Sequence, residues 1–472
     1  MKNSAVKMRV LISVCAVCCV ALLGFGVWKS GLLRKNPGTD NTDNKTVKTT
    51  ITPGETSNKT PTPGDTNTTP TPTEPAPAEP TPTDIPLELE TSEELTVSSS
   101  VEPVETKTMD DSMRTAYSTF AYKLFAQLPE GKTRMISPFS IYVALSMLAD
   151  GADGNTLAQL DELLGLTAEE RNAYLAGWLQ DLEGNTSFTN ADSVWLSEGS
   201  KSLVSKDFLD TCAQYFKAAV FSTPMDDSTI NDINAWVKAK TRNMIDKIMD
   251  EIAPLTAMIL TNAITLDAKW EEEFDEENTV KDEAFEKADG TTGSVDMMYG
   301  YLTDGYLEND LATGFIKPYK GGKFSYVALL PKWDYDRNAN VSLEQLLASL
   351  SPESVRSLLD NKHEGEIYLG VPKYEAKYSI ELKDVLKQLG VTDAFDEKAN
   401  FSRMGEALDV LVGKVTHKTF ISVDEKGTQA AAVSQVEMVW KSMPPYVILN
   451  RPFVYMIVDS DGLPIFLGTY EG

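Results

Sequence analysis

Apolar positions recur at helical spacing early in the body of the chain, and in short runs or alternation toward its end. Between Ser112 and Leu128, apolar residues return every three or four positions, which predicts a helix. One further helix is predicted to start at Ser137-Pro138 and to end at a turn over Asp150 to Thr156, and another runs from that turn to about Leu164. Helices are also predicted over Asn231 to Met249, Leu343 to Leu359 and Leu382 to Leu389. Strands are predicted over Phe188 to Leu196, Met258 to Leu266, Phe285 to Pro331 and Leu411 to Leu467. Helices early and strands late, without regular alternation, indicate the α+β class.

One stretch near the end of the chain has the pattern of a loop and of a strand together. Gly427 and the alanines that follow are small and offer no packing anchor, which is typical of an exposed loop. Yet Thr428, Ala430, Ala432 and Ser434 alternate with polar neighbours, which is typical of a half-buried strand. This double pattern predicts a segment with two states.

The amino-terminal pattern differs from the rest. Lys2, Lys7 and Arg9 precede an apolar run from Val10 to Trp28. A helix of this length covers about 29 Å, close to the thickness of the hydrocarbon layer of a bilayer. The run is longer than a usual signal sequence and lacks a clean cleavage site. We therefore expect residues 1–35 to be an export signal or a membrane anchor, with the retained anchor favoured, and the body to be extracytoplasmic.

Residues 36–86 are rich in Pro, Thr and Asn, residues 87–108 are acidic and rich in Ser and Thr, and no aromatic residue occurs between Trp28 and Tyr117. We take 36–108 together as one segment. Such a composition cannot build a core and predicts an extended linker. As polyproline II, about 50 residues would reach on the order of 150 Å. The linker is then a tether that holds a domain, residues 109–472, away from a cell surface, or else a passive tail.

Charge and composition exclude several classes of function. The formal net charge is -27, which repels phosphate backbones and disfavours nucleic acid as a partner. Of the four cysteines only Cys212 lies in the body, so no disulfide can form there. Two histidines, His363 and His417, leave little for a metal site or a catalytic triad. The common nucleotide, redox and hydrolase motifs are absent from the sequence. We therefore expect no cofactor, no metal and no enzymatic turnover.

Several short motifs occur together in one order, and His417 stands eight residues before Glu425. The motifs are Ser137-Pro138 with Ser140, Gly151-Ala152 with Gly154, Ile233-Asn234 with Trp236, Thr261-Asn262-Ala263-Ile264 with Trp270, Val371-Pro372-Lys373-Tyr374, Leu389-Gly390-Val391-Thr392-Asp393-Ala394-Phe395 and Asn450-Arg451-Pro452-Phe453. On these residues the chain resembles a serpin, a member of the serine protease inhibitor family, over about residues 110 to 472.

The resemblance implies a fold and a mechanism. The fold is a set of helices packed around a large central mixed sheet, with an exposed reactive loop near the carboxyl end, in a monomer. A target protease cuts the loop and forms an acyl-enzyme. The loop then enters the sheet as a new strand and carries the protease with it, which distorts the protease and traps the ester.

The resemblance also assigns roles to residues. The hinge that enters the sheet would include Glu425, Gly427, Thr428, Ala430 and Ala432, where bulky or charged side chains would cost several kcal/mol. Family spacing from Glu425 places the reactive bond at Lys441–Ser442. Lysine there suits a trypsin-like protease. Ser137, Ser140, Asn262 and His417 match the polar cluster beneath the point where the sheet opens, and Trp270 matches the tryptophan at which the loop first enters.

Two alternatives stay open at this point. One is a non-inhibitory surface binding protein with the serpin fold. The other is an inhibitor whose target is subtilisin-like or papain-like, because a shift of one residue would expose Trp440 or Ser442 as the specificity residue.

Overall fold

A computed structural model describes residues 87–96, 104–129, 133–183, 188–254, 256–334, 339–427 and 444–472. These residues belong to one compact unit, Glu79–Gly472. The expected anchor over 1–35 and most of the linker over 36–108 lie outside the described residues, as do Thr428, Ala430, Ala432, Lys441 and Ser442. No helix within the described ranges is both long and apolar enough to cross a bilayer.

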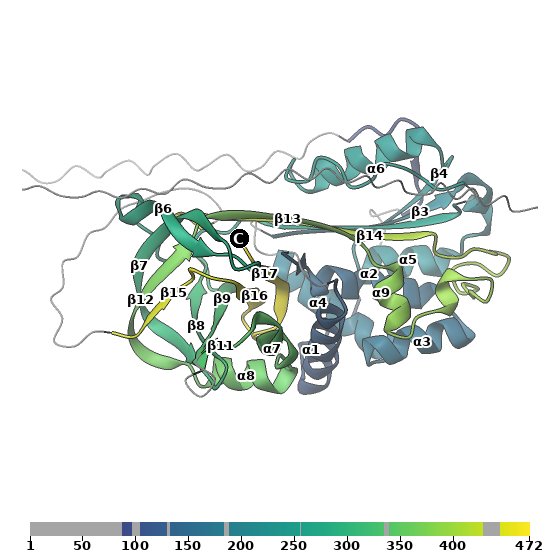
Figure 1. Cartoon of the computed structure of the whole chain (residues 1–472). Coiled ribbons are helices and arrows are strands. Elements are labelled where there is room, and N and C mark those ends of the chain that lie inside the picture. Colours follow the sequence, from purple (N-terminus) through teal and green to yellow (C-terminus); the bar gives the residue numbers. More distant parts are fainter. Residues whose placement is uncertain are drawn as a thin grey trace, which may run out of the picture. The chain divides into compact units, whose positions relative to one another are not determined.

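The first sheet is central to the site. Its six strands lie in the order β1-β4-β3-β5-β14-β13 (Figure 1). They are β1 (Glu93–Glu94), β4 (Ala219–Thr223), β3 (Phe188–Ser197), β5 (Met258–Leu266), β14 (Lys414–Val423) and β13 (Tyr374–Glu381). All pairs are antiparallel except β3 with β4 and β5 with β14, which are parallel. The sheet is therefore mixed, as expected.

The described residues form helices, several of which lie on the two faces of this sheet. They are α1 (Asp111–Ala126), α2 (Pro138–Gly151), α3 (Gly154–Leu164), α4 (Ala168–Glu183), α5 (Lys206–Tyr215), α6 (Asp227–Lys240), α7 (Leu343–Ala348), α8 (Pro352–Asp360) and α9 (Lys383–Gln388). Helices α2 and α4 contact one face, and α6 lies across the other face over β3 and β4 (Figure 1).

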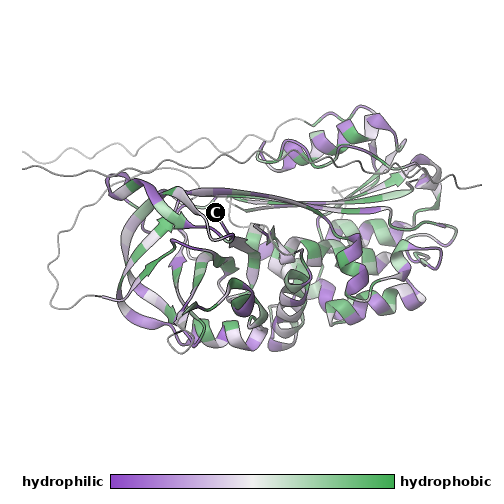
Figure 2. Ribbon diagram, viewed as in Figure 1, coloured by the Kyte–Doolittle hydropathy of each residue, from purple (hydrophilic) through white to green (hydrophobic). Residues whose placement is uncertain are grey.

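Helix α6 encloses a small second core. It carries hydrophilic and hydrophobic residues together (Figure 2), and its apolar residues Ile233 and Trp236 are buried against the sheet. The Trp236 ring meets Trp195 of β3 edge-on, with centroids 6.3 Å apart, and Trp195 stacks on Phe221 of β4 at 4.1 Å. This packing couples α6 to the half of the sheet that contains β3 and β4.

A second sheet of nine strands stands against the helices. Its order is β15-β12-β7-β8-β9-β16-β17-β2, and β6 pairs with β7. The strands are β2 (Met135–Ile136), β6 (Thr279–Glu286), β7 (Thr292–Glu308), β8 (Ala312–Pro318), β9 (Phe324–Pro331), β12 (His363–Pro372), β15 (Tyr446–Ile448), β16 (Phe453–Asp459) and β17 (Pro464–Tyr470). Strands β10 (Trp333–Asp334) and β11 (Ala339–Asn340) form a separate short pair.

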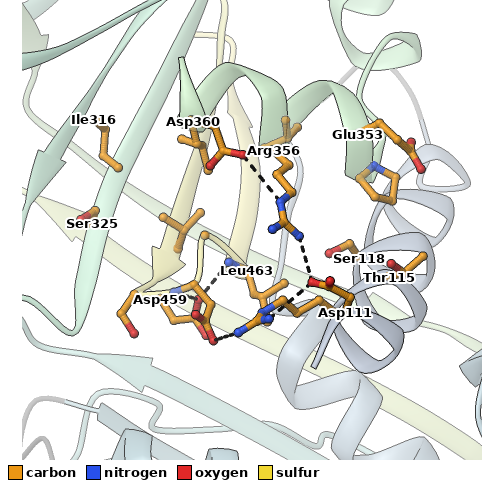
Figure 3. Close-up of a pocket in the computed structure, with 18 of the residues that line it drawn as sticks. Asp111, Thr115, Ser118, Ile316, Ser325, Glu353, Arg356, Asp360, Asp459 and Leu463 are labelled. Carbon is orange, nitrogen blue, oxygen red and sulfur yellow. Dashed lines mark hydrogen bonds and ion pairs between the residues drawn. The ribbon is translucent and has the colours of Figure 1, made fainter. Parts of the chain in front are cut away.

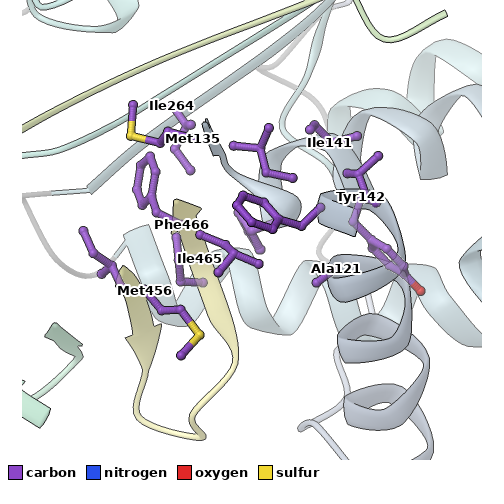
Figure 4. Packing of buried hydrophobic residues seen from close by; sticks show 14 of the residues in the cluster. Ala121, Met135, Ile141, Tyr142, Ile264, Met456, Ile465 and Phe466 are labelled. Carbon is purple, nitrogen blue, oxygen red and sulfur yellow. The ribbon is translucent and has the colours of Figure 1, made fainter. Parts of the chain in front are cut away.

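The main core joins both sheets through α2. Met135 of β2, Ile264 of β5 and Phe466 of β17 lie together beside α2, and all three are fully buried (Figure 4). Burial of such side chains supplies roughly 1.5–3 kcal/mol each relative to exposure. The buried faces of β5 and β17 explain their nearly continuous apolar sequences.

Several predicted elements coincide with the structure, and others were wrong. The helix from Ser112 and the strands over Phe188 and Met258 match α1, β3 and β5. The predicted helix over Asn231 to Met249 is too long, because α6 ends before Arg242 and Asn243, which both have positive φ. The predicted helix over Leu343 to Leu359 is two helices, because Ser351 and Pro352 start a new one. Helices α4 and α5 were missed.

The assignment of all residues up to 108 to the linker also needs correction. Within residues 87–96, strand β1 pairs with β4, and the side chain of Leu89 packs against the core under α6. The carboxylate of Asp232 on α6 accepts hydrogen bonds from the backbone N–H groups of residues 90–92, at 2.6 to 3.0 Å. Hydrogen bonds to a buried carboxylate, rather than a hydrophobic pattern, order this segment.

Candidate functional site

The polar cluster begins where α2 starts. Ser137 precedes the helix, and its Oγ accepts a hydrogen bond from the backbone N–H of Ser140 at 3.2 Å. Serine followed by Pro138 is a favoured helix start, because the hydroxyl satisfies an N–H that the helix leaves unpaired and proline has no N–H to satisfy. Both serines are fully buried. The local sequence therefore fixes one end of the cluster.

His417 on β14 connects α2 to β5. Its Nε2 accepts a hydrogen bond from the backbone N–H of Ser137 at 3.0 Å. The ring proton is therefore on Nδ1, which donates to Oδ1 of Asn262 at 2.8 Å. Burial lowers the pKa of His417 to about 3, so the ring is neutral at physiological pH. Protonation of Nε2 would set an N–H against the N–H of Ser137.

Asn262 on β5 extends the connection to a third strand. Its Nδ2 donates to the backbone carbonyl of Ser140 at 2.8 Å and to Oδ1 of Asp192 on β3 at 2.5 Å. In the sheet Asn262 is the direct partner of His417 on one side and of Asp192 on the other. One chain of hydrogen bonds, which we call the latch, thus runs across β3, β5 and β14 and ends on α2.

Asp192 is a member of the latch that the sequence analysis missed. It is 3% exposed, and its hydrogen-bond donors are the side-chain amides of Asn262 and Asn190. Burial raises its pKa to about 7, although both hydrogen bonds act in the opposite direction. The signal in the sequence was a carboxylate within a strand of buried residues, the kind of position that requires donors.

The boundary between β5 and β14, which we call the seam, is closed at one end only. The two strands pair from Lys414 with Ile259 to Thr419 with Ile264. Beyond Thr419, the last residues of β14 pair with β13 and, among the described residues, with no residue of β5. The latch lies at the closed end, because His417 and Asn262 are partners there. A strand could be added at the other end.

Trp270 lies beside the open end of the seam. Its indole N–H donates to the backbone carbonyl of Asp424 at 2.9 Å, and its ring stacks on Tyr319 with centroids 4.4 Å apart. The backbone N–H of Trp270 donates to the carbonyl of Lys426 at 3.1 Å. The tryptophan is 1% exposed. It therefore holds the turn that follows β14 at the end of the sheet.

Gly427 is the last described residue before the loop, and it already occupies the seam. It forms single antiparallel bridges to Lys269, which follows β5, and to Asp424, which follows β14. Its φ is +109°, and an added Cβ would meet the Ala268 carbonyl oxygen and the Trp270 nitrogen at 2.5 Å. Only glycine fits this conformation and this space.

Glu425 anchors the same turn by its side chain. It is 6% exposed, forms an ion pair with Lys373 at 2.8 Å and accepts a hydrogen bond from Thr279 Oγ1 at 2.8 Å. Partial burial acts to raise the pKa of Glu425, but the hydrogen bonds from Lys373 and Thr279 outweigh it and hold that pKa below its ordinary value. Lys373 and Thr279 were not predicted, although Lys373 lies within one of the sequence motifs.

The structure thus brings the predicted site residues into two groups. Ser137, Asn262 and His417 meet in the latch, and Ser140 contributes backbone groups to it. The hydroxyl of Ser140 has no hydrogen-bond partner among the described residues. Trp270 joins Glu425 and Gly427 at the open end of the seam. The reactive bond, Lys441–Ser442, lies outside the described residues, and so do Thr428, Ala430 and Ala432.

A cavity of about 760 Å³ lies elsewhere, between α1, α8 and the turn after β16 (Figure 3). Its charged side chains contact one another: Arg356 lies 3.4 Å from Asp111, and Arg114 lies 3.1 Å from Asp461. Asp459 also lines the cavity, and it accepts a hydrogen bond from Trp178 Nε1 at 2.9 Å. Burial raises the pKa of Asp459 to about 7. These mutual pairs leave the cavity without an obvious site for a charged ligand.

The described part of the chain contains no group of three or more His, Cys, Asp or Glu side chains that could hold a metal ion. Cys212 is buried and free, and burial raises the pKa of its thiol. It is therefore a packing residue of α5.

Comparison with known proteins identifies relatives over most of the folded unit. The family profile described as Serpin (serine protease inhibitor) matches residues 115–471. Neuroserpin of Gallus gallus is 31% identical over 377 residues, which are 74% of this chain and 88% of that protein. Intracellular coagulation inhibitor 2 of Tachypleus tridentatus is 29% identical over 383 residues, 76% of this chain and 90% of that protein.

Solved structures agree with this match. The native state of the thermophilic serpin tengpin is similar with a TM-score of 0.74 and 35% identity, over 81% of this chain and all of that one. Protease nexin-1 with heparin is similar with a TM-score of 0.67 and 27% identity, over 76% and 99% of the two chains. The strand order, the latch and these matches lead to one conclusion: the chain belongs to the serpin family of serine protease inhibitors.

Proposed function

We propose that the chain inhibits trypsin-like serine proteases as a suicide substrate, cleaved at Lys441–Ser442. The position of Gly427 carries the proposal. This residue bridges Lys269, which follows β5, and Asp424, which follows β14, at the open end of the seam. The residues after it could therefore enter between the two strands from that end. Their sequence offers small side chains at Thr428, Ala430 and Ala432, which a closely packed sheet can accept.

The driving force for insertion would be the pairing that β14 lacks. Backbone groups beyond Thr419 would gain a partner strand on the β5 side. A net gain of about 0.5–1.5 kcal/mol per hydrogen bond, over several bonds, would amount to several kcal/mol. The latch opposes insertion, because the hydrogen bond between His417 and Asn262 crosses the seam.

The choice of trypsin-like targets depends on Lys441 alone. A lysine in a protease-accessible loop is recognised by specificity pockets that carry a carboxylate. Trp440 would narrow the set of targets. The apolar run over residues 10–28 and the linker support an extracytoplasmic position, with the inhibitor tethered at a cell surface and acting as a monomer.

The deciding experiment uses the full chain and trypsin. We expect a covalent complex that survives SDS, loss of this complex in Lys441→Glu, and a higher melting temperature after the loop is cut by a protease that does not form the complex. Cleavage of the loop by trypsin that then remains fully active would contradict the proposal. Profiling subtilisin-like and papain-like proteases in the same assay separates the alternative targets.

A second candidate function is ligand binding without inhibition. Two observations favour it: the cavity in Figure 3, and the similarity of the fold to thyroxine-binding globulin in complex with thyroxine, at 24% identity and a TM-score of 0.68. Under this reading loop cleavage would leave the melting temperature unchanged. The paired charges of the cavity argue for a neutral occupant.

A further inference from the structure

Four tyrosines lie on one face of the second sheet, where β7, β12 and β15 meet. Tyr301, Tyr368 and Tyr446 are direct partners across these three strands, so their side chains point to the same side. Tyr299 precedes Tyr301 by two residues and shares that side. We call these four residues the tyrosine face.

The tyrosine face is exposed yet ordered. Tyr301 is 48% and Tyr446 is 61% exposed. The rings of Tyr299 and Tyr368 are nearly parallel, with centroids 5.6 Å apart, and Tyr301 contacts Tyr368 at 5.1 Å. Gly370 makes room for this arrangement, because an added Cβ would lie 3.0 Å from the ring of Tyr299. The side chains of these tyrosines therefore lose little further conformational entropy when a partner binds.

Exposed aromatic side chains of this kind are not needed to pack a core, and they are typical of surfaces that bind another protein. Large exposed aromatic groups that hold one another in place are enriched at the centres of protein interfaces. One edge carries charge: Glu283 on β6 accepts a hydrogen bond from Tyr299, and burial together with this carboxylate raises the pKa of that tyrosine. A complementary partner presents an apolar surface with a basic edge.

The covalent chain connects this face to the proposed bait bond. The backbone N–H of Tyr368 donates to the carbonyl of Pro445 at 3.0 Å, so Pro445 and Tyr446 are fixed beside β12. Ser442 precedes Pro444 by two residues, which span at most about 7 Å. A protease that holds the Lys441–Ser442 bond must therefore be near the tyrosine face. A standard interface buries about 800 Å² on each partner, more than a short loop supplies.

We propose that the tyrosine face is a secondary contact surface for the trypsin-like protease that attacks Lys441–Ser442. The proposal rests on the proposed function and adds a determinant of the rate of capture. The face contacts the protease before and during acylation, when the protease is at the carboxyl side of the loop. It has no role in loop insertion, because it belongs to the other sheet.

The test is a double variant, Tyr301→Ser with Tyr446→Ser, assayed against trypsin and a second lysine-cleaving protease of the same fold. We expect the second-order rate constant of inhibition to fall about tenfold or more for at least one of them, as for hot-spot residues. The number of inhibitor molecules consumed per protease and the melting temperature should not change. Leu203→Ser is the matched control, since Leu203 is 39% exposed and follows β3, a strand of the first sheet. Tyr301→Phe with Tyr446→Phe should retain most of the rate.

The other outcomes of this test distinguish failure of the inference from failure of the proposed function. If the wild-type chain forms a complex and the double variant forms it equally fast with both proteases, the inference is wrong while the proposed function stands. If the wild-type chain forms no complex with either, the proposed function fails and the inference fails with it. A fall in rate that only accompanies a lower melting temperature would also overturn the inference. Binding of the wild-type chain to insoluble polysaccharide, lost in the double variant at an unchanged inhibition rate, would assign the face to carbohydrate instead.

Discussion

At the scale of single residues, the latch contains two titratable groups, Asp192 and His417. Their pKa shifts have opposite effects on how the stability of the fold depends on pH. Burial raises the pKa of Asp192 to about 7 and lowers that of His417 to about 3. Between pH 4 and 6.5, Asp192 keeps in the folded state a proton that the unfolded chain has lost, so its contribution to stability decreases as pH rises toward 7. His417 is neutral in the folded state while the unfolded chain binds a proton, so its contribution decreases as pH falls below 6.5. Each effect is about 1.4 kcal/mol per pH unit, and over this window they cancel.

We predict that Asp192→Asn removes the pH-dependent contribution of Asp192 to stability and leaves that of His417. The melting temperature of the variant should rise from pH 4.5 to 6.5 more steeply than that of the wild-type chain, because the His417 effect is then unopposed. Above pH 7 the variant should be the more stable protein, since no charge is buried. After its own amide flips, Asn190 can accept a hydrogen bond from the new amide through Oδ1, which has no partner among the described residues. Calorimetry at several pH values is the measurement, and parallel curves for the two proteins would refute it.

Gly427 allows a second prediction at this scale. Gly427→Ala should lower the stability by about 1–3 kcal/mol, because of the positive φ and the contacts at 2.5 Å around the added methyl group. Gly290→Ala is the matched control: Gly290 also has a positive φ, of +78°, but no atom within 4 Å of an added Cβ. Thermal denaturation of both variants gives the difference. Equal losses would mean that backbone conformation alone matters and that the close approach to Trp270 does not.

At the scale of elements, one side chain makes many of the hydrogen bonds that attach residues 87–96 to the body, in addition to the pairing of β1 with β4 and the packing of Leu89. The Asp232 carboxylate accepts hydrogen bonds from three backbone N–H groups and from the hydroxyls of Thr91 and Ser92. Burial acts to raise the pKa of Asp232, but these hydrogen bonds hold it below its ordinary value. The segment thereby joins α6 to the edge of the sheet.

We predict that Asp232→Ala releases this segment. Three backbone N–H groups would lose their acceptor, at a cost of about 1–3 kcal/mol, and a protease should cut within residues 87–96 much faster. Asp227→Asn is the control, because Asp227 is exposed on the same helix and, among the described residues, forms no hydrogen bond or ion pair with residues 87–96. Limited proteolysis followed by mass spectrometry locates the cuts. Protection of the segment in Asp232→Ala at the wild-type level would show that strand pairing alone holds it.

Elements also show where prediction from sequence succeeds and fails. Strand β5 was predicted at its observed bounds, because burial on both faces makes most of its sequence apolar, apart from Thr261, Asn262 and Thr265. Segment 87–96 has no such pattern, and its order depends on a carboxylate about 140 residues away in sequence. The latch residues Ser137, Asn262 and His417 could be named only through the family resemblance. Asp192 could not, because its role arises from pairing between strands that the sequence does not specify.

At the scale of the whole molecule, the open end of the seam makes the sheet an acceptor for a strand. A synthetic peptide with the sequence of residues 427–441 should add there, since it supplies the same small side chains. We predict a rise of about 10 °C or more in melting temperature and loss of protease inhibition, as expected for several new hydrogen bonds. The same peptide with Ala430→Arg is the control. Inhibition that survives saturation with the peptide would contradict a role for the seam in trapping the protease.

The two-residue strand β1 has a consequence for behaviour in concentrated solution. It forms the outer edge of the central sheet, and both of its residues, Glu93 and Glu94, are exposed carboxylates. A second copy that approached this edge to extend the sheet would meet the carboxylate of Glu94 and the ion pair of Glu93 with Lys201, on a chain of net charge -27. Repulsion at the edge therefore keeps neighbouring molecules dispersed at neutral pH. High salt screens this repulsion, and aggregation at high salt should start at the unpaired edge of β1.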